Sequence, residues 1–569
     1  MNLNLIDIEK ELDEKFYSLS IWKLPFQTII SYLLLIADRL DQTGRPGIAL
    51  DLLSRISLIY PTIKQHANKK HIQRTSTSLA EVKNKQHVEE LSFLVAYAHF
   101  SMLMPQVHRG TLVVTKTEGN KIYLNYSNEE IIHSELIDKL YSYISLLMVL
   151  SYKDEDAFKK YLGTRKSTDN PFSNGLDFVW IKSIYEHYKK FTFDVRVLPS
   201  NAFADAVGVK FEDVYSFMAA LRAFADFYTL QARSIKINED NSETINQRLL
   251  ATYQDLAVCV LDYKTLGLFM GISGLKREVF DKILSFFLEI YTNKTKEQFQ
   301  SNSYCGDGYL PPIILIDKFI VFSPLAIKSF LNINNILYSI NKTNKKLFDQ
   351  KVSPHLEPAL INQLNYIFSH INGVRIKNNI LYNKSEVDMM VLSESEKTCI
   401  VIQVKTTIAP DSARTVERVQ SRTMEAKKQI ETFDSLENVE KLDIVNNSFK
   451  VSMDALKFIN LIVVRSSAGS HKAWEINKQY RIVNYALISK VLCKKIQKKD
   501  HTIANIDKEI LAEQSYILAK SDWSVKFGTI KLDKLEIECP DIDYIDENLI
   551  SYNLDSLKCF KYYEKTDFD

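Results

Sequence analysis

The hydrophobic pattern changes near residue 350, and this change constrains the fold more than any other feature of the sequence. Before it, apolar residues recur at three- and four-residue spacing, as in "TIISYLLLIADRL" at 28–40, which is typical of amphipathic helices. After it, three strand-like runs follow one another between residues 374 and 406. A chain of 569 residues is also too long for one hydrophobic core. We therefore expect an α+β multidomain protein.

The region from residue 1 to 350 is expected to be mostly helical, in one or two subdomains that sense a signal, form homo-oligomers or bind a partner protein. Glycine and proline are scarce, at 15 and 13 residues, which favours long helices. Two exceptions are a predicted hairpin at 111–126, around a Glu-Gly-Asn turn, and a strand-bearing piece at 309–324. The predicted helices lie at 28–40, 47–60, 86–104, 128–151, 210–234, 246–262 and 274–293.

Residues 351–495 are predicted to form an α/β domain with a central mixed sheet flanked by helices. Its first helix should begin after Ser353 as N-cap and end before Gly373. The remaining residues, 496–569, form a C-terminal extension with no assigned role, in which a helix is expected near 505–519 and strand-like residues at 530–539. In the domain itself, strands are expected at 374–381, 386–393, 398–406, 458–467 and 481–489, and a second helix at 412–433.

Net charge, cysteine spacing and the length of apolar runs limit the partners and the cellular compartment that we expect for this protein. The net charge of +2 excludes a general polycation, so a nucleic-acid surface must be a local patch. The six cysteines show no metal-ligand spacing and are read as reduced thiols. The acidic start is not a signal peptide, and the apolar run at 140–150 is too short to span a bilayer. We expect a cytoplasmic protein with no membrane partner.

Three polar residues interrupt the predicted strand pair 386–393 and 398–406. Side chains alternate along a strand, so Gln403 and Lys405 share a face with Cys399 and Val401. The turn "SESEK" at 393–397 makes the two strands antiparallel neighbours, which places Asp388 beside Gln403 and Lys405. Burying such groups without partners costs several kcal/mol, which indicates that the site uses them.

These residue types suit metal-dependent hydrolysis. Oxygen ligands from Asp388 and Gln403, with the backbone carbonyl of Val404, fit a hard divalent cation. Lys405 then lies near enough to orient or polarise a water that attacks phosphorus. The spacing therefore predicts hydrolysis of a phosphodiester.

The order helix, strand, strand with Asp, strand with Gln-x-Lys, helix resembles the PD-(D/E)XK nuclease superfamily, whose members have the restriction-endonuclease-like fold. Asp388 matches the motif aspartate, and Gln403 with Lys405 matches the (D/E)XK element in a QXK form. Glu357 matches the glutamate that many members carry in the preceding helix. The resemblance covers about residues 350–490. The sequence departs from the pattern at Val387, where a proline is usual, and at Gln403, a neutral ligand, so that metal affinity would rest on Glu357 or Glu386.

The resemblance implies a Mg²⁺- or Mn²⁺-dependent DNA endonuclease. Asp388, Gln403 and Glu357 would bind the metal, Asp388, Gln403 and Lys405 would form the catalytic group, and DNA is a better-matched substrate than RNA. A stripe of Arg414, Arg418 and Arg422 on the following helix would hold the phosphate backbone. By analogy, such a nuclease serves bacterial restriction or anti-phage defence.

Simpler readings of the same residues stay open. The three strand residues can be polar strand ends facing water, Glu357 can meet the helix dipole, and the arginine stripe can be a solvated helix face. The alternative functions are a non-catalytic helical scaffold or adaptor with a nuclease-like nucleic-acid-binding domain, and a DNA-repair nuclease.

Overall fold

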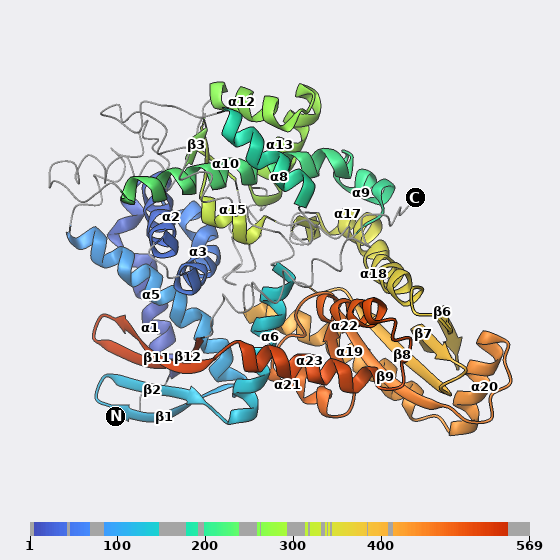
Figure 1. Ribbon diagram of the computed structural model, residues 1–569. Coiled ribbons are helices and arrows are strands. Elements are labelled where there is room, and N and C mark those ends of the chain that lie inside the picture. Colours follow the sequence, from blue (N-terminus) through green and yellow to red (C-terminus); the bar gives the residue numbers. More distant parts are fainter. Residues whose placement is uncertain are drawn as a thin grey trace.

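The protein, seen in a computed structural model, has an α+β fold in which two mixed sheets and one small antiparallel sheet are surrounded by helices (Figure 1). Two hairpins from distant parts of the chain lie side by side below the N-terminal helices. The structure describes residues 5–42, 46–68, 85–146, 178–191, 198–237, 259–261, 263–292, 313–316, 319–331, 336–337, 340–341, 344–383, 385–407 and 413–543.

The N-terminal helices surround one core with the first sheet. The predicted helices at 28–40, 47–60 and 86–104 are confirmed as α2, α3 and α5, each longer than its apolar pattern. Their buried faces form a common cluster with strand residues such as Leu124 and Ile537. The helices of this core are α1 (Leu5–Ser18), α2 (Phe26–Gln42), α3 (Pro46–His66) and α5 (Lys85–His108), whereas α6 (Glu129–Leu146) packs in the core of the five-stranded sheet described below.

A four-stranded sheet joins the N-terminal region to the C-terminal extension. The predicted hairpin at 111–126 is confirmed as β1 (Leu112–Glu118) and β2 (Lys121–Tyr126). The strand-like residues at 530–539 belong to a second hairpin, β11 (Ser524–Leu532) and β12 (Leu535–Asp543). Strand β12 pairs in parallel with β2, so that the order is β1-β2-β12-β11.

A layer of helices in the middle of the sequence forms a second core. The predicted helices at 210–234 and 274–293 are confirmed as α10 and α13. Of the predicted helix at 246–262, residues 259–261 form strand β3 instead, pairing with β5, and residues 246–258 and 262 lie outside the described part. The elements are α8 (Phe178–Phe191), α9 (Ser200–Val207), α10 (Phe211–Ile237), β3 (Cys259–Leu261), α12 (Tyr263–Ser273), α13 (Arg277–Thr292), β4 (Ile314–Ile316), β5 (Phe319–Phe322), α15 (Pro324–Phe330) and α17 (Lys345–Leu347).

The second half of the chain forms a five-stranded mixed sheet of order β10-β9-β8-β7-β6. Antiparallel pairing joins β6, β7 and β8, and parallel pairing joins β8, β9 and β10. The first three strands fall where the sequence predicts them. The elements are α18 (Ser353–Phe368), β6 (Val374–Tyr382), β7 (Ser385–Ser393), β8 (Thr398–Lys405), α19 (Ala413–Asp434), α20 (Asn438–Phe449), β9 (Lys457–Val464), α21 (His471–Trp474), β10 (Arg481–Asn484), α22 (Tyr485–Lys498) and α23 (Ile506–Lys520).

Two local predictions in this half are wrong. Ser353 is not an N-cap, because a π-helical turn over 348–352 leads directly into α18. The predicted strand at 481–489 ends at Asn484, whose side chain accepts a hydrogen bond from the Leu487 N–H and so begins α22. The helix expected near 505–519 is confirmed as α23.

Helix α6 fastens the N-terminal region to this sheet through one buried carboxylate. Asp138 accepts hydrogen bonds from the Ser467 hydroxyl at 2.5 Å, the Ala468 N–H at 2.8 Å and the Trp474 ring N–H at 3.1 Å. The N–H of Gly469 is a fourth donor at 3.1 Å. These bonds fix the loop after β9 against α6.

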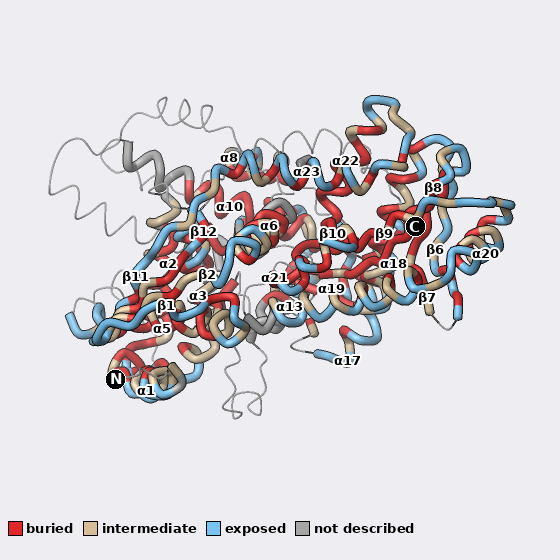
Figure 2. The backbone as a smooth tube through the Cα atoms, turned by 90° about the horizontal axis from the view of Figure 1, so that it is seen from below, coloured by how far each residue is buried: buried red, intermediate tan, exposed pale blue. Residues whose placement is uncertain are grey.

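Buried residues concentrate along the strands and the helix faces that cover them (Figure 2). In the five-stranded sheet, Ile400 and Ile402 pack in a cluster with Leu364 of α18, whereas Val401 packs in a cluster with Phe433 of α19. Both faces of the sheet are therefore covered by helices. No helix in the described part of the chain is long and apolar enough to cross a bilayer.

Candidate active site

The candidate site lies where β7 and β8 separate. Their antiparallel register runs from Ser393 opposite Thr398 to Met389 opposite Ile402, and it stops before Asp388. Strand β7 also pairs with β6, through Val387 and Met389 on either side of Asp388, but Asp388 itself has no partner in β6. The β6 residue that would stand opposite, Asn379, has a left-handed backbone with φ of 52°. The backbone of Asp388 is therefore paired with neither β6 nor β8.

The carboxylate of Asp388 reaches across the gap to β8. Its Oδ2 accepts a hydrogen bond of 2.7 Å from the backbone N–H of Val404. No hydrogen bond to its Oδ1 is present within the described residues, so that this oxygen keeps its lone pairs for another partner. Strand alternation predicts that Val387, Met389 and Val391 share one face, and this is wrong for Val387. It packs with Met390, on the opposite side from Met389, because the strand is irregular at Asp388.

Gln403 is fully buried at the same point. Its side-chain amide donates a hydrogen bond of 2.8 Å to the backbone carbonyl of Glu386. Its Oε1 is buried and has no hydrogen-bond partner among the described residues, which carries a desolvation cost. This geometry explains a glutamine in place of an acid, because an ionised carboxylate cannot donate to the Glu386 carbonyl.

Lys405 is held by a glutamate from the preceding helix. Its side chain is 7% exposed, and its Nζ lies 3.6 Å from a carboxylate oxygen of Glu357 on α18. Glu357 itself is 36% exposed and is therefore open to solvent on one side. The charge of the buried ammonium is thus compensated by a carboxylate that solvent and ligands can reach.

The charges of Lys405, Glu357 and Glu386 act on the carboxylate of Asp388. Burial raises the pKa of Asp388 to about 6, while the Val404 N–H and the Lys405 charge oppose this rise. The charges of Glu357 and Glu386 also contribute to this rise in the pKa of Asp388. Asp388, Lys405 and Glu357 are therefore close together, and Gln403 contacts the same strand two residues from Asp388, at the Glu386 carbonyl.

The oxygen donors fit a hard divalent cation in their chemistry. Asp388 Oδ1 and Gln403 Oε1 lack hydrogen-bond partners within the described residues, and both belong to the ligand types that Mg²⁺ and Mn²⁺ prefer. The Lys405 carbonyl accepts from Arg465 on the β9 side, so alternation turns the Val404 carbonyl towards β7. Across the described ranges, no group of three or more His, Cys, Asp or Glu side chains is placed to hold a metal. A cation at this site would therefore need the Gln403 amide oxygen and the Val404 carbonyl as ligands beside the Asp388 carboxylate.

The structure describes two of the three arginines in the predicted stripe. Arg418 and Arg422 are exposed on α19, and Arg422 pairs with Glu425 at 3.0 Å. Arg414 belongs to the same helix, but its side chain lies outside the described residues. The apolar positions of α19 form a separate face, which is buried at Val419, Thr423, Ala426, Ile430 and Phe433.

Comparisons with protein-family models, with curated proteins and with solved structures gave no match for this chain. The assignment of a function therefore rests on the geometry of the site and on the chemistry of its side chains.

Proposed function

We propose that the protein is a metal-dependent DNA endonuclease of the PD-(D/E)XK type. One observation supports the proposal: a carboxylate, a buried amide oxygen without a partner in the described residues and a buried ammonium belong to the residues at which β7 and β8 separate. Buried polar oxygens usually have a hydrogen-bond partner or a ligand. An incoming cation would satisfy the amide oxygen.

Asp388 and Gln403 would hold Mg²⁺ or Mn²⁺, with Glu357 and the Val404 carbonyl completing the protein ligands. When bound, the cation supplies positive charge that stabilises the phosphoryl oxygens during hydrolysis. The Val404 N–H fixes one oxygen of Asp388, so that the other is presented in a single orientation.

Lys405 supplies a fixed positive charge beside the metal ligands. Its side chain is buried, so its charge acts at low dielectric and needs little reorganisation during the reaction. Glu357 restrains its position. From there the ammonium can donate hydrogen bonds to a water molecule or to a phosphate oxygen, and so orient the attacking water.

The choice of DNA as substrate comes from the family resemblance. Arg418 and Arg422 add exposed positive charge on α19, the helix that follows the site strand. Contacts of this kind bind the phosphate backbone and position the duplex without reading its sequence. A role in restriction or anti-phage defence rests on the same analogy.

A second candidate is a nucleic-acid-binding scaffold that does not cleave. The absence, in the described ranges, of three clustered metal-binding side chains favours it. A site with one carboxylate and one amide binds metal more weakly than a site with two acids, since ligand charge sets affinity.

The test is plasmid cleavage by the purified full chain with Mg²⁺ or Mn²⁺. We expect nicking or linearisation that falls by at least about a hundredfold in Asp388→Asn and in Lys405→Met, variants that keep side-chain volume. DNA affinity, measured with Ca²⁺ in place of the active metal, should change little in these variants. Arg422→Gln should instead weaken binding and reduce its dependence on salt.

Intact folding with no cleavage of single-stranded, double-stranded or branched DNA would support the scaffold instead. Cleavage that persists in Asp388→Asn would exclude the proposed site. Phage plating and survival after DNA damage, compared in cells that carry each variant, separate defence from repair.

A further inference from the structure

The loop after β9, residues 465–470, connects the candidate active site with the N-terminal region. Its first two residues hold the end of β8. The Arg465 N–H donates a hydrogen bond of 3.0 Å to the carbonyl of Lys405. The Ser466 N–H donates a hydrogen bond of 3.1 Å to the hydroxyl of Thr407. The loop therefore fixes the chain at Lys405 and directly after it.

The same loop holds the helix that carries Glu357. The Arg465 guanidinium donates a hydrogen bond of 2.7 Å to the side-chain carbonyl of Gln363 on α18. Both side chains are buried, so this bond is shielded from water. Lys405 and Glu357 come from β8 and α18, and the loop joins these two elements at a second point. The distance of 3.6 Å between the ammonium and the carboxylate therefore depends on the loop.

The loop also sets the position of α19. The Ala468 carbonyl accepts a hydrogen bond of 2.8 Å from the hydroxyl of Thr423 on this helix. The Ser470 hydroxyl donates to the side-chain carbonyl of Gln420, which lies between the two exposed arginines of the predicted stripe. Three elements of the site, β8, α18 and α19, are therefore held by one short loop.

Helix α6, in the N-terminal region, supports this loop and lies against α21 and α23 (Figure 1). The buried carboxylate of Asp138 accepts hydrogen bonds from the Ser467 hydroxyl and from two backbone N–H groups of the loop. One turn earlier, Glu135 accepts from the His471 N–H at 3.3 Å. Without the Asp138 carboxylate, buried donors of the loop would lack an acceptor, which is costly. The conformation of the loop therefore depends on α6.

We propose that Asp138 is a positioning residue of the candidate active site: it holds the loop after β9, and the loop holds Lys405 in its reactive position. The hydrogen bonds of Asp138 within the described residues go to this loop and to Trp474, so it acts through the loop. The proposal rests on the proposed function, because it gives Asp138 a part in that reaction. It adds that the N-terminal region completes the site.

The test is plasmid cleavage by the full chain with Asp138→Leu, which keeps side-chain volume and removes the acceptor. We expect kcat to fall about a hundredfold, the effect of a displacement of about 1 Å at the reacting groups. The KM for plasmid should change by less than about threefold, since the exposed arginines keep their charge. Asp138→Asn should keep kcat within about threefold of wild type, because its amide oxygen can accept from the same two N–H groups.

Asp38→Leu is the matched control for a loss of stability. Asp38 is also a buried aspartate, and it accepts from the Ser323 hydroxyl at 2.9 Å and from the Leu325 N–H at 3.3 Å. These bonds join α2 to the start of α15, outside the five-stranded sheet. The control should lower the melting temperature by an amount comparable to Asp138→Leu and leave kcat unchanged while both variants are folded. An equal fall of kcat in both would overturn the proposal.

A double-variant cycle with Lys405→Met tests the route. Asp138→Leu should slow the Lys405→Met protein by less than about threefold, because the group that it positions is gone. A further loss of about a hundredfold would overturn the proposal. If Asp138→Leu does not fold, Ser467→Ala decides. It removes one donor to Asp138 and should lower kcat about fivefold, whereas an unchanged kcat would overturn the proposal.

Amide hydrogen exchange separates this proposal from the nuclease. Asp138→Leu should accelerate exchange about tenfold at the Arg465 and Ser466 amides, which hold the end of β8, and Asp38→Leu should not. Acceleration in a chain that cleaves no DNA would overturn the nuclease and support the coupling of α6 to β8. Cleavage by the wild type, with kcat and exchange unchanged in Asp138→Leu, would overturn the positioning role and leave the nuclease.

Discussion

At the scale of single residues, the site combines groups that a stable core would exclude. Asp388 is held where burial opposes its ionisation, and Gln403 keeps a buried oxygen without a partner in the described part of the chain. Both features lower the stability of the metal-free protein, and both would favour the binding of a cation. The cost to stability should therefore be measurable in the metal-free protein.

Asp388→Asn should stabilise the metal-free protein at pH 7 by about 2 kcal/mol. The pKa of Asp388 is raised to about 6 in the folded state, against 3.8 as its ordinary value. Between pH 4 and 6 the unfolded chain therefore releases its proton first, and the stability of the wild type falls as pH rises. The asparagine still accepts from the Val404 N–H. Urea unfolding across this range measures the difference.

At pH 4 or below the two proteins should be equally stable, which serves as the internal control. Added Mn²⁺ should raise the melting temperature of the wild type at pH 7 and leave that of Asp388→Asn unchanged, since only the ionised carboxylate binds the cation. Equal stability at every pH would show that Asp388 ionises freely.

Lys405→Met should make Mn²⁺ binding more sensitive to acid. The Lys405 charge lowers the pKa of Asp388, so its removal should move the midpoint of the pH dependence of Mn²⁺ binding up by about one unit. Calorimetric titration with Mn²⁺ at a series of pH values measures this midpoint.

Glu386→Gln is the matched opposite change, because the Glu386 charge raises the pKa of Asp388. Its midpoint should move down. Shifts in the same direction for both variants would indicate a general loss of packing instead of an electrostatic effect.

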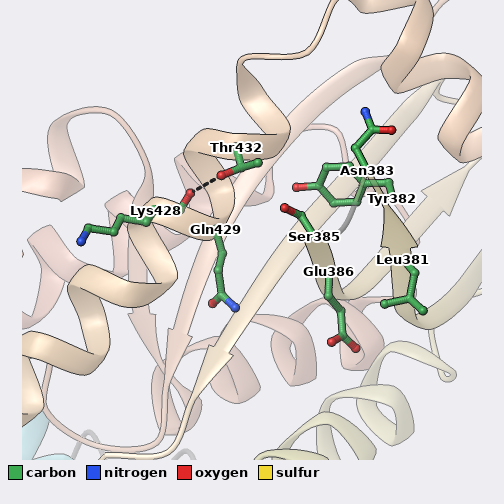
Figure 3. A pocket seen from close by; sticks show the side chains of 8 residues that line it. All are labelled: Leu381, Tyr382, Asn383, Ser385, Glu386, Lys428, Gln429 and Thr432. Carbon is green, nitrogen blue, oxygen red and sulfur yellow. Dashed lines mark hydrogen bonds between the residues drawn. The ribbon is translucent and has the colours of Figure 1, made fainter.

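Residue spacing was enough to predict which side chains meet, and too little to predict their partners. Alternation along the strand and a short turn place Asp388 beside Gln403. Nothing in the sequence shows that Gln403 must donate to the Glu386 carbonyl, or that Tyr382 and Gln429 line one hollow between the β6–β7 turn and α19 (Figure 3). Those relations arise from the irregularity of β7 and from the docking of α19.

At the scale of elements, strands were predicted better than their ends. The hairpin strands β7 and β8 carry the apolar runs "MMVL" (389–392) and "CIVI" (399–402) on either side of a polar turn, a pattern with few alternatives. By contrast, "RIVNYALIS" (481–489) is apolar enough for a strand throughout, and only the Asn484 cap divides it into β10 and α22. A short apolar run does not distinguish a strand from a buried helix turn.

Helix α19 is positioned by the loop after β9, and a single glycine permits the contact. Gly469 has a φ of 114°, and a Cβ at this position would lie 2.7 Å from the backbone nitrogen of Gln420. Gly469→Ala should therefore destabilise the protein by about 3 kcal/mol, measured by urea unfolding.

Gly373→Ala is the control for backbone conformation alone. Gly373 also has a left-handed φ, of 81°, but a Cβ there meets no atom within 4 Å. The cost should be about 1 kcal/mol. Equal effects of the two substitutions would mean that the contact with α19 is loose.

At the scale of the whole molecule, sequence order and spatial order differ. The pattern change near residue 350 predicts a helical region and a following α/β region, and both are present. It does not predict that β12, near the end of the described chain, pairs with β2. Strand pairing across some 400 residues leaves no local signal, because periodicity reports burial and not the partner.

This pairing makes the N-terminal helices depend on the C-terminal hairpin. Ile537 on β12 is fully buried in the cluster that contains Leu103 and Met104 of α5. Ile537→Ala should destabilise that cluster by about 3 kcal/mol. Amide hydrogen exchange in α5 should accelerate accordingly, although the substitution lies more than 400 residues away in sequence.

Phe527→Ala on the neighbouring strand β11 is the matched control, because Phe527 is 52% exposed. Its effect should stay within about 0.5 kcal/mol, with α5 exchange unchanged. If the hairpin were an independent appendage, Ile537→Ala would accelerate exchange in β11 and β12 alone. Acceleration in α5 as well means that both ends of the described chain form one folding unit, so that removing the C-terminal hairpin would expose the core of the N-terminal helices.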